Sequence, residues 1–367
     1  MEQVEARVGG VGSALADGEG RGARAFRRVR VEDVALEAEV SKTTAASILR
    51  EAPNFQVSEA TRHRVLAAAR SLGYRRHAVA VALSSGRTNT VGLLLPLAAI
   101  DARLPTSRIY GQDIFVAVFQ AASRAGLRVT AIPLSGKDAH LPLQALTDRS
   151  VDGIVMASMP GPEFVREVYQ AGIPCVEIGS GHGRYLVHPD NEGGAEAAVA
   201  HLVALGHRRI VHWRGAGENY ASVRRRKGFV AAAKRHRLPA SSTWVAKTQA
   251  EVEALLRLGP GERPTAVFAY NDFQGCLTLD IARELGLRVP HELSIVGFDD
   301  NVLAEAARPQ LSTIHNPLGV QAEAAIALLQ ALCRGEEPPA PAPVPTELII
   351  RHSAGPVPSG DAATSPR

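Results

Sequence analysis

A change of hydrophobic periodicity near Thr90 divides this chain into two parts that must fold differently. Before Thr90, apolar residues recur at the three- and four-residue spacing of amphipathic helices. After it, continuous apolar runs of strand length, beginning with 91–96, alternate with helical segments. Such runs are typical of strands that are buried on both faces of a parallel sheet. We therefore predict a small all-α domain followed by a large α/β domain.

The part before Thr90 predicts a helix-turn-helix with a supporting third helix. The expected helices are 33–38, 42–49 and 59–72. Ser41 and Ser58 stand where N-caps belong, and Gly73 is a suitable stop for the third helix. Glu39 and Val40 form the tight turn between the first two helices. Residues 77–85 could form one more short helix, which would be only marginally stable alone.

The part after Thr90 predicts two doubly wound sheets with a cleft between them, because about 260 residues remain for it. The expected strands are 91–96, 128–133, 151–157, 175–178, 209–213, 266–269 and 294–298. The expected helices are 114–125, 163–171, 193–205, 224–236, 275–285 and 320–334. A proline-rich stretch at 336–345 is interpreted as a late linker.

The domain boundaries follow from these patterns. We expect a disordered tail at 1–28, a helix-turn-helix domain at 29–76, a hinge helix and linker at 77–89, a core at 90–353 and a second disordered tail at 354–367. No stretch approaches the roughly 20 apolar residues that span a bilayer, and the first 28 residues lack the apolar run of a signal peptide. These observations predict a cytoplasmic protein without a membrane partner.

Charge is concentrated near the N-terminus. The whole chain has a formal net charge of +4, but residues 21–87 contain 13 Lys and Arg against 6 Asp and Glu. The residues after Thr90 contain 27 of each sign and are neutral overall. A basic module on a neutral body indicates a polyanion partner at one end, although a solvated basic surface would give the same count.

Motifs at matching spacing then recur along nearly the whole chain. They are 31–35, 40–44, 58–65 and 72–74, followed by 151–154, 172–174, 190–191, 201–202, 206–210, 225, 228–229, 271–272, 286–290 and 297–300. In this order they resemble the LacI/GalR family of repressors. The resemblance implies an all-α helix-turn-helix headpiece and an α/β, periplasmic-binding-protein-like core of two doubly wound subdomains. It also implies a homodimer that binds double-stranded operator DNA and whose affinity is controlled by a small effector, a sugar or sugar derivative.

The DNA-binding residues are expected at the start of the second helix, which a helix-turn-helix inserts into the major groove. Lys42 can donate to guanine, and Thr43 can hydrogen-bond or touch a thymine methyl group. Ser41 and Thr44 suit phosphate contacts. Alternatively, Lys42 and Thr43 are simply exposed helix residues. The chain departs from the family at Ser47, where an Arg is usual, and at Arg50, where an Asn is usual.

The remaining predicted DNA-binding residues are Asn54 and Tyr74 in the headpiece, and Ala80 and Leu83 in the hinge. In relatives a pair of hinge helices enters the minor groove and a Leu wedges into the central base step. Leu83 matches that Leu, and Ala80 matches the small residue that lets the two helices approach. Arg76 replaces the usual Pro, and Leu83 could instead pack against the core domain. A hinge that folds only on DNA would give an effector a means of control.

For the effector, the resemblance points to Arg225 and Asp272, which in relatives face the cleft and hydrogen-bond sugar hydroxyls. An interdomain salt bridge is the alternative role for this pair. Asp190 and Asn191 stand at a helix start, where capping is as good an explanation as ligand contact. Tyr220 could stack on a sugar ring or belong to the core.

Enzyme motifs are missing from the sequence, and no cofactor, metal site or catalytic residue is expected. Asp299 and Asp300 are adjacent on a strand end, so their side chains should point in opposite directions. The three cysteines, Cys175, Cys276 and Cys333, have neither metal-ligand nor redox spacing. An enzyme on a two-lobed fold and a sugar-binding protein of a transporter remain the alternative classes.

Overall fold

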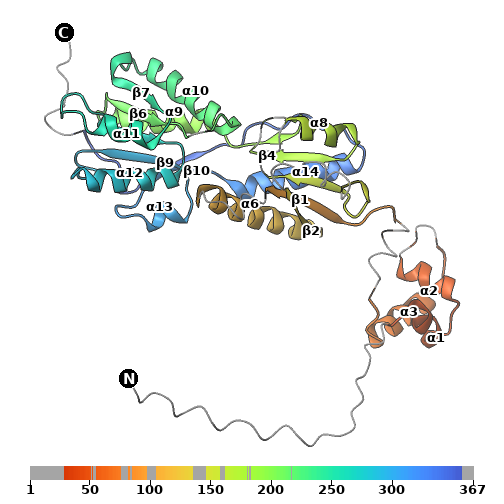
Figure 1. The fold of residues 1–367 in the computed structure, drawn as a ribbon. Coiled ribbons are helices and arrows are strands. Elements are labelled where there is room, and N and C mark those ends of the chain that lie inside the picture. The colour runs from red at the N-terminus through yellow and green to blue at the C-terminus, as the bar shows by residue number, and fades with distance from the viewer. Residues whose placement is uncertain are drawn as a thin grey trace, which may run out of the picture. The chain divides into compact units, whose positions relative to one another are not determined.

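The computed structural model describes residues 29–50, 52, 55–75, 82, 85–96, 105–134, 146–157, 162–179, 181, 183–215 and 217–357. The chain forms two compact units that divide between Ser85 and Gly86 (Figure 1). The predicted tail at 1–28 and nearly all of the predicted hinge helix lie outside the described residues. Among the described residues, no helix is both long and apolar enough to cross a membrane.

The small unit is a bundle of short helices, as predicted. Its described helices are α1 (Val31–Glu37), α2 (Lys42–Leu49) and α3 (Glu59–Ser71). The hydroxyls of Ser41 and Ser58 accept the backbone N–H groups of Thr44 and Thr61, which confirms both N-caps. Glu39 has a φ of 53°, the left-handed conformation that reverses the chain between α1 and α2.

All three helices contribute to one small apolar core. Its fully buried members are mostly short side chains, which let the helices approach closely. They are Val34, Ala35, Ala38, Ala45, Ile48, Val65, Ala68 and Ala69. Because α2 points Ala45 and Ile48 inward, the opposite side of α2 remains available to a partner.

The first lobe of the large unit is built on a parallel five-stranded sheet of order β2-β1-β3-β4-β5 within the described residues. The strands are β1 (Thr90–Pro96), β2 (Arg128–Leu134), β3 (Gly153–Met156), β4 (Cys175–Ile178) and β5 (Leu186–Val187). Helices α6 (Pro105–Arg124) and α14 (Leu318–Cys333) cover one face, and α8 (Pro162–Gln170) covers the other.

The second lobe holds a six-stranded sheet of order β11-β10-β9-β8-β6-β7, counted over the same described residues. The strands are β6 (Ile210–Trp213), β7 (Thr243–Ala246), β8 (Ala266–Ala269), β9 (Ser294–Asp299), β10 (Ser312–His315) and the antiparallel edge strand β11 (Glu347–Ile349). Its helices are α9 (Asn191–Ala204), α10 (Tyr220–Arg235), α11 (Gln249–Leu256), α12 (Asp272–Glu284) and α13 (Val302–Ala306). A short 3₁₀ helix, η1, spans Ala240–Ser242. The predicted pair of doubly wound sheets is therefore confirmed.

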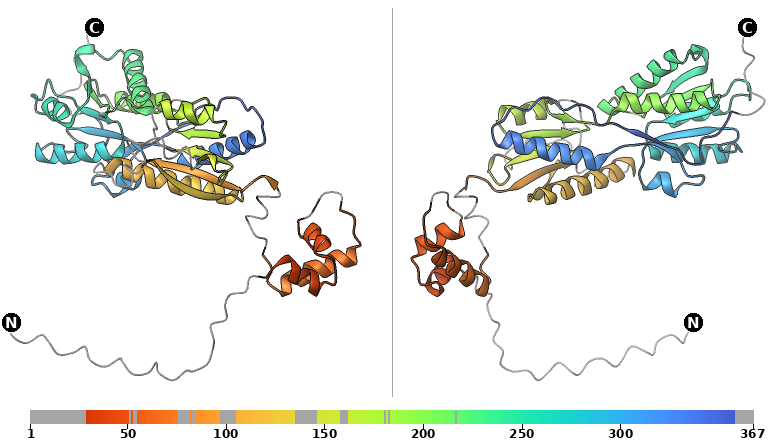
Figure 2. Two further views of the ribbon diagram at one scale, coloured as in Figure 1. Left: turned by 45° about the vertical axis from the view of Figure 1, so that its right-hand side comes forward. Right: turned by 180° about the vertical axis from the view of Figure 1, so that it is seen from behind.

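The described chain crosses between the two lobes at three places: after β5, after β10 and after α14. Two crossings run side by side, because Pro189 and Val344 form a parallel bridge. The Asp190 N–H donates to the Val344 carbonyl at 2.7 Å, and the Val344 N–H donates to the His188 carbonyl at 2.9 Å. The proline-rich stretch is thus the third crossing, visible in blue between the lobes in Figure 2.

Both ends of the core are held by hydrogen bonds to neighbouring elements. At its start, the Asp152 carboxylate accepts the backbone N–H groups of Thr88 and Asn89 at 2.6 and 2.8 Å. At its end, the Gly355 carbonyl accepts the Ser294 hydroxyl at 3.1 Å. The prediction of a disordered tail from residue 354 is therefore wrong for 354–357, because these residues supply hydrogen bonds to the sheet. Residues 358–367 lie outside the described chain.

Candidate DNA-binding and effector sites

The first turn of α2 presents the polar residues predicted to contact DNA. Lys42 and Thr43 are exposed, whereas Thr44 is half-buried. The Ser41 hydroxyl lies 2.8 Å from the Thr44 hydroxyl and also accepts the Thr44 N–H. This cap fixes the start of the helix, so the positions of Lys42 and Thr43 are set by the backbone rather than by flexible loops.

Lys42 has an intramolecular partner that the sequence analysis did not single out. Its ammonium lies 2.6 Å from the Glu32 carboxylate of α1, and both side chains are more than half exposed. The hydrogen bond from Lys42 holds the pKa of Glu32 below its ordinary value. The residue predicted to read a base is therefore oriented by an acidic neighbour.

The other predicted headpiece residues occupy different environments. Ser47 is half-buried on α2, and the Arg50 guanidinium donates from Nε to the Ala46 carbonyl at 3.2 Å while remaining exposed. Tyr74 packs partly buried against the headpiece core. Asn54, Ala80 and Leu83 lie outside the described residues, so their predicted contacts remain predictions.

A cavity of about 550 Å³ lies between α6 of the first lobe and the starts of α12, α13 and α14. Part of its polar wall comes from the carboxyl ends of the strands, where ligands bind in open α/β sheets, and part comes from α6. The polar members of the wall are Tyr110, Asp113, Gln120, Asn271, Asp299, Asp300, Asn301, His315 and Asn316. The volume lies in the range of roughly 300–1,000 Å³ that is usual for small-molecule sites.

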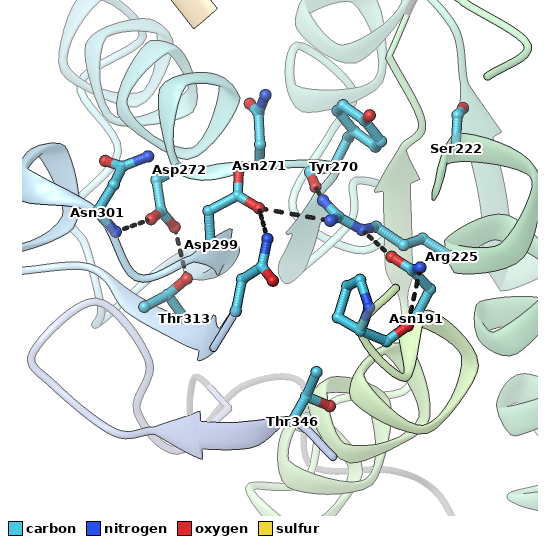
Figure 3. Close-up of polar contacts among 12 residues, drawn as sticks. Asn191, Ser222, Arg225, Tyr270, Asn271, Asp272, Asp299, Asn301, Thr313 and Thr346 are labelled. Atoms are coloured by element: carbon cyan, nitrogen blue, oxygen red, sulfur yellow. Dashed lines mark hydrogen bonds and ion pairs between the residues drawn. The ribbon is translucent and has the colours of Figure 1, made fainter. Parts of the chain in front are cut away.

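Arg225 lies directly behind this wall and is only 4% exposed. Its Nε donates to Asn191 Oδ1 at 2.9 Å, and its two terminal nitrogens contact the Tyr270 carbonyl and the Asp299 carboxylate (Figure 3). The guanidinium carbon stands 3.4 Å from the centre of the Phe298 ring, a cation–π contact. All of these contacts hold Arg225 in place as the buried counter-ion of Asp299.

We expected Asp272 to face the cavity, but it is not among the residues that line it. It is fully buried at the first position of α12, and its carboxylate accepts the Thr313 hydroxyl and the Asn301 N–H at 2.5 and 2.9 Å. Both oxygens are thus used within the lobe, and burial raises the pKa of this carboxyl well above its usual range. The alternative role, a salt bridge between Arg225 and Asp272, is not found either, because Arg225 pairs with Asp299.

The remaining predicted effector residues are not among the residues that line the cavity. Asp190 Oδ1 accepts the Gly193 N–H at 2.8 Å and caps α9, which was the alternative role for that residue. Asn191 is buried against Arg225. The Tyr220 hydroxyl lies 3.1 Å from His188 Nε2, and the two rings meet edge to face.

Comparisons with known proteins match both units of the chain. The family "Bacterial regulatory proteins, lacI family" matches residues 30–77, and "Periplasmic binding protein-like domain" matches 199–354. The HTH-type transcriptional regulator CelR of Thermobifida fusca is 30% identical over 345 residues, which cover 89% of this chain and 98% of CelR. The chain belongs to the LacI family. It is accordingly a DNA-binding transcriptional regulator and not an enzyme.

Solved structures show the same architecture. A CelR–cellobiose complex is 27% identical, covers 89% of this LacI-family chain and 100% of that chain, and has a TM-score of 0.63. The Lac repressor dimer bound to operator and the anti-inducer ONPF has a TM-score of 0.74 at 23% identity. It covers 90% of this chain and 100% of that chain, and it shows that the fold is shared.

Three wall residues of this LacI-family core were missed by the sequence analysis: Asp299, Asn271 and Asn316. Asp299 has a φ of 111° and Asp300 a φ of 56°, so the chain turns sharply at the end of β9. As expected, the two carboxylates have separate partners. Asp300 contacts Arg351 and His315, whereas Asp299 contacts Arg225 and Asn316. The separate partners of the two side chains argue against catalysis by a pair of carboxylates. Asp299 remains available to bind a ligand.

Proposed function

We propose that this LacI-family regulator is a repressor that binds operator DNA as a homodimer and releases or grips it in response to a saccharide effector. The observation that carries the proposal is the presence in one chain of an exposed Lys42–Thr43 turn on α2 and a polar cavity between two lobes. Each headpiece would contact one half-site of a near-palindromic operator. DNA binding would place the protein at the nucleoid.

A saccharide suits the polar wall of the cavity. The wall combines carboxylate acceptors at Asp299 and Asp113 with amide groups at Asn271 and Asn301, and a sugar hydroxyl can donate to the first kind and accept from the second. The related CelR was solved in complex with cellobiose. Because the cavity spans both lobes, ligand binding would change how the lobes close about the three crossings.

A homodimer is supported by an apolar surface on the core. The side chains of Phe119 on α6, Val302 on α13 and Val320 on α14 are 52%, 66% and 54% exposed. Val116 on α6 is also about half exposed, and Val116, Val302 and Val320 all border the same cavity. These helices therefore offer one apolar face, hereafter the α6 face, that a second copy would cover.

Operator binding is the direct test. Genomic fragments that the full-length protein retains would be sequenced, and the affinity for the best fragment would be measured for Lys42→Ala, Thr43→Ala and a control, Lys234→Ala, at an exposed position of α10. Loss of a specific base contact costs roughly 1–3 kcal/mol, or about 5- to 150-fold in Kd. If the unaltered chain and the three variants bound the fragment equally well, the proposed role of α2 in reading the operator would be contradicted.

Control by an effector has its own test. Operator affinity would be measured with and without neutral saccharides, and saccharide affinity with and without operator. Linkage requires the two effects to be the same factor. A saccharide that binds the core tightly but leaves operator affinity unchanged would contradict the regulatory role, while the DNA-binding role would stand.

A further inference from the structure

The described wall of the cavity is acidic. It bears three carboxylates, from Asp113, Asp299 and Asp300, and neither Lys nor Arg is among its described residues. Arg225 and Arg351 lie behind the wall, where each is already paired with a wall carboxylate. Among these described residues, a negatively charged ligand would therefore meet carboxylates without a Lys or Arg free to pair with it.

The three carboxylates differ in how far they are neutralised. Asp300 contacts Arg351 at 2.7 Å through one oxygen and His315 Nδ1 at 2.9 Å through the other. A single oxygen of Asp299, Oδ1, accepts hydrogen bonds from the Arg225 guanidinium at 3.4 Å and from the Asn316 amide at 3.3 Å. Its Oδ2 has no hydrogen-bond partner among the described residues, so it can accept from a ligand.

Asp113 is the carboxylate whose negative charge is not balanced by a partner among the described residues. It stands on α6 next to Ile114, whose fully buried side chain fixes this turn of the helix against the core. Within the described chain, Asp113 has neither a hydrogen bond nor an ion pair. Asp113 is exposed, and the partial loss of its hydration raises its pKa. Burial raises the pKa of Asp299, and the Asp113 charge adds to that rise, whereas Arg225 and Asn316 oppose it. A further negative charge in the cavity would add to this repulsion.

Apart from His315, the side-chain donors among the described wall residues are neutral. The side-chain oxygen of Asn271 accepts the Gln274 N–H, and that of Asn301 accepts the Leu303 N–H, so each amide keeps its NH₂ group for a ligand. Hydroxyl groups match this wall because they donate to carboxylates and accept from amides. A phosphate or ligand carboxylate can only accept, and it would have to do so beside Asp113 and Asp299.

We propose that the cavity admits uncharged saccharides and rejects their anionic counterparts, with Asp113 as the residue that sets this preference. The inference rests on the proposed function, because it narrows the class of effector at the same cavity. Phosphorylated sugars and uronic or aldonic acids are excluded. Sugars and short glycosides without an acidic group are accepted.

The test compares matched probes on the full-length protein. Titration calorimetry would compare four pairs: cellobiose with cellobionate, glucose with glucose 6-phosphate, glucose with glucuronate, and galactose with galacturonate. Each pair would be measured for the unaltered chain, for Asp113→Asn and for the control Asp280→Asn. Asp280 is an exposed α12 residue paired with Arg283, so its substitution makes the same change of net charge away from the cavity.

The expected result is that the neutral member of any binding pair is preferred by about tenfold or more. Asp113→Asn should reduce that preference at least several-fold, whereas Asp280→Asn should leave it unchanged. An anionic probe that binds as tightly as its neutral counterpart would overturn the inference and leave the proposed function standing. Equal behaviour of the two variants would overturn the role of Asp113. If no saccharide bound the unaltered chain, both the inference and the proposed saccharide effector would fall.

Discussion

At the scale of single residues, the headpiece holds its proposed reading residue in an exposed ion pair. Lys42 of α2 contacts Glu32 of α1 at 2.6 Å. An exposed pair contributes little to stability, but it competes with any phosphate or base that Lys42 would contact. The Glu32 carboxylate also adds a negative charge next to a surface proposed to approach the DNA backbone. Glu32 should therefore weaken DNA binding rather than support the fold.

We accordingly predict that Glu32→Gln raises operator affinity several-fold, because it releases Lys42 and removes one repulsive charge. Unfolding of the headpiece should change little. The measurement is a fluorescence-anisotropy titration at several salt concentrations, with Glu37→Gln as the matched control, since Glu37 is exposed on the same helix. Weaker binding by Glu32→Gln would show instead that the pair positions Lys42 for readout.

The effector residues show how far residue-level reasoning could reach. The importance of Arg225 was predictable from its motif, because the family resemblance places this Arg next to the effector. Which aspartate pairs with it was not predictable, since Asp272 and Asp299 both follow strands and both resemble ligands in sequence. The left-handed backbone conformation at Asp299 directs its carboxylate towards Arg225, so Asp299 rather than Asp272 is the partner. Backbone conformations of this kind leave little trace in a single sequence.

At the scale of elements, continuous apolar runs gave the reliable predictions. β4 and β8 were predicted to the residue, because strands buried on both faces have a distinctive composition. Strand β7, at a sheet edge and only partly buried, was missed, as were the short helix α13 and the strand β10. Helix α12 begins three residues earlier than expected, because Asn271 supplies its N-cap.

Buried histidines join several of these elements and make the core sensitive to acid. His207 is fully buried, and its two ring nitrogens contact the Thr265 hydroxyl and the Gly355 carbonyl at 2.9 and 3.0 Å. His212 of β6 lies between Phe229 and Phe268, and burial lowers its pKa to about 3. Burial also lowers the pKa of His207. Both are therefore neutral in the folded core at neutral pH.

The direction of the pH effect follows from these lowered pKa values. Below the ordinary value of 6.5 the unfolded chain binds a proton at His212 and the folded chain does not, so stability falls as pH falls towards 3. One such group costs about 1.4 kcal/mol per pH unit below 6.5. We predict that urea unfolding of His212→Phe depends less on pH by about this slope between pH 6.5 and 5. His352→Asn, at an exposed site, should match the unaltered chain. Identical slopes in all three proteins would contradict the prediction.

At the scale of the whole molecule, the α6 face would link ligand binding to the proposed assembly. It borders the cavity through Val116, Val302 and Val320. A second copy that covers this face would sit against the same helices, α6, α13 and α14, that contribute to the cavity. Lobe movement on ligand binding would then shift the dimer surface together with the linkers that leave the core at Thr88. The hydrogen bonds from the Thr88 and Asn89 N–H groups to the Asp152 carboxylate would carry that movement to the linkers.

The test of this assembly is to place a charge on the α6 face. Phe119 is 52% exposed and its ring stacks on that of Phe115. In a twofold interface each substitution acts twice, and burying one Phe contributes roughly 1.5–3 kcal/mol. Phe119→Asp should therefore weaken dimerisation about a hundredfold or more in sedimentation velocity, and weaken operator binding with it. Val230→Asp changes an equally exposed apolar residue on α10, away from the cavity. It should remain dimeric, and a dimer of Phe119→Asp as tight as that of Val230→Asp would place the interface elsewhere.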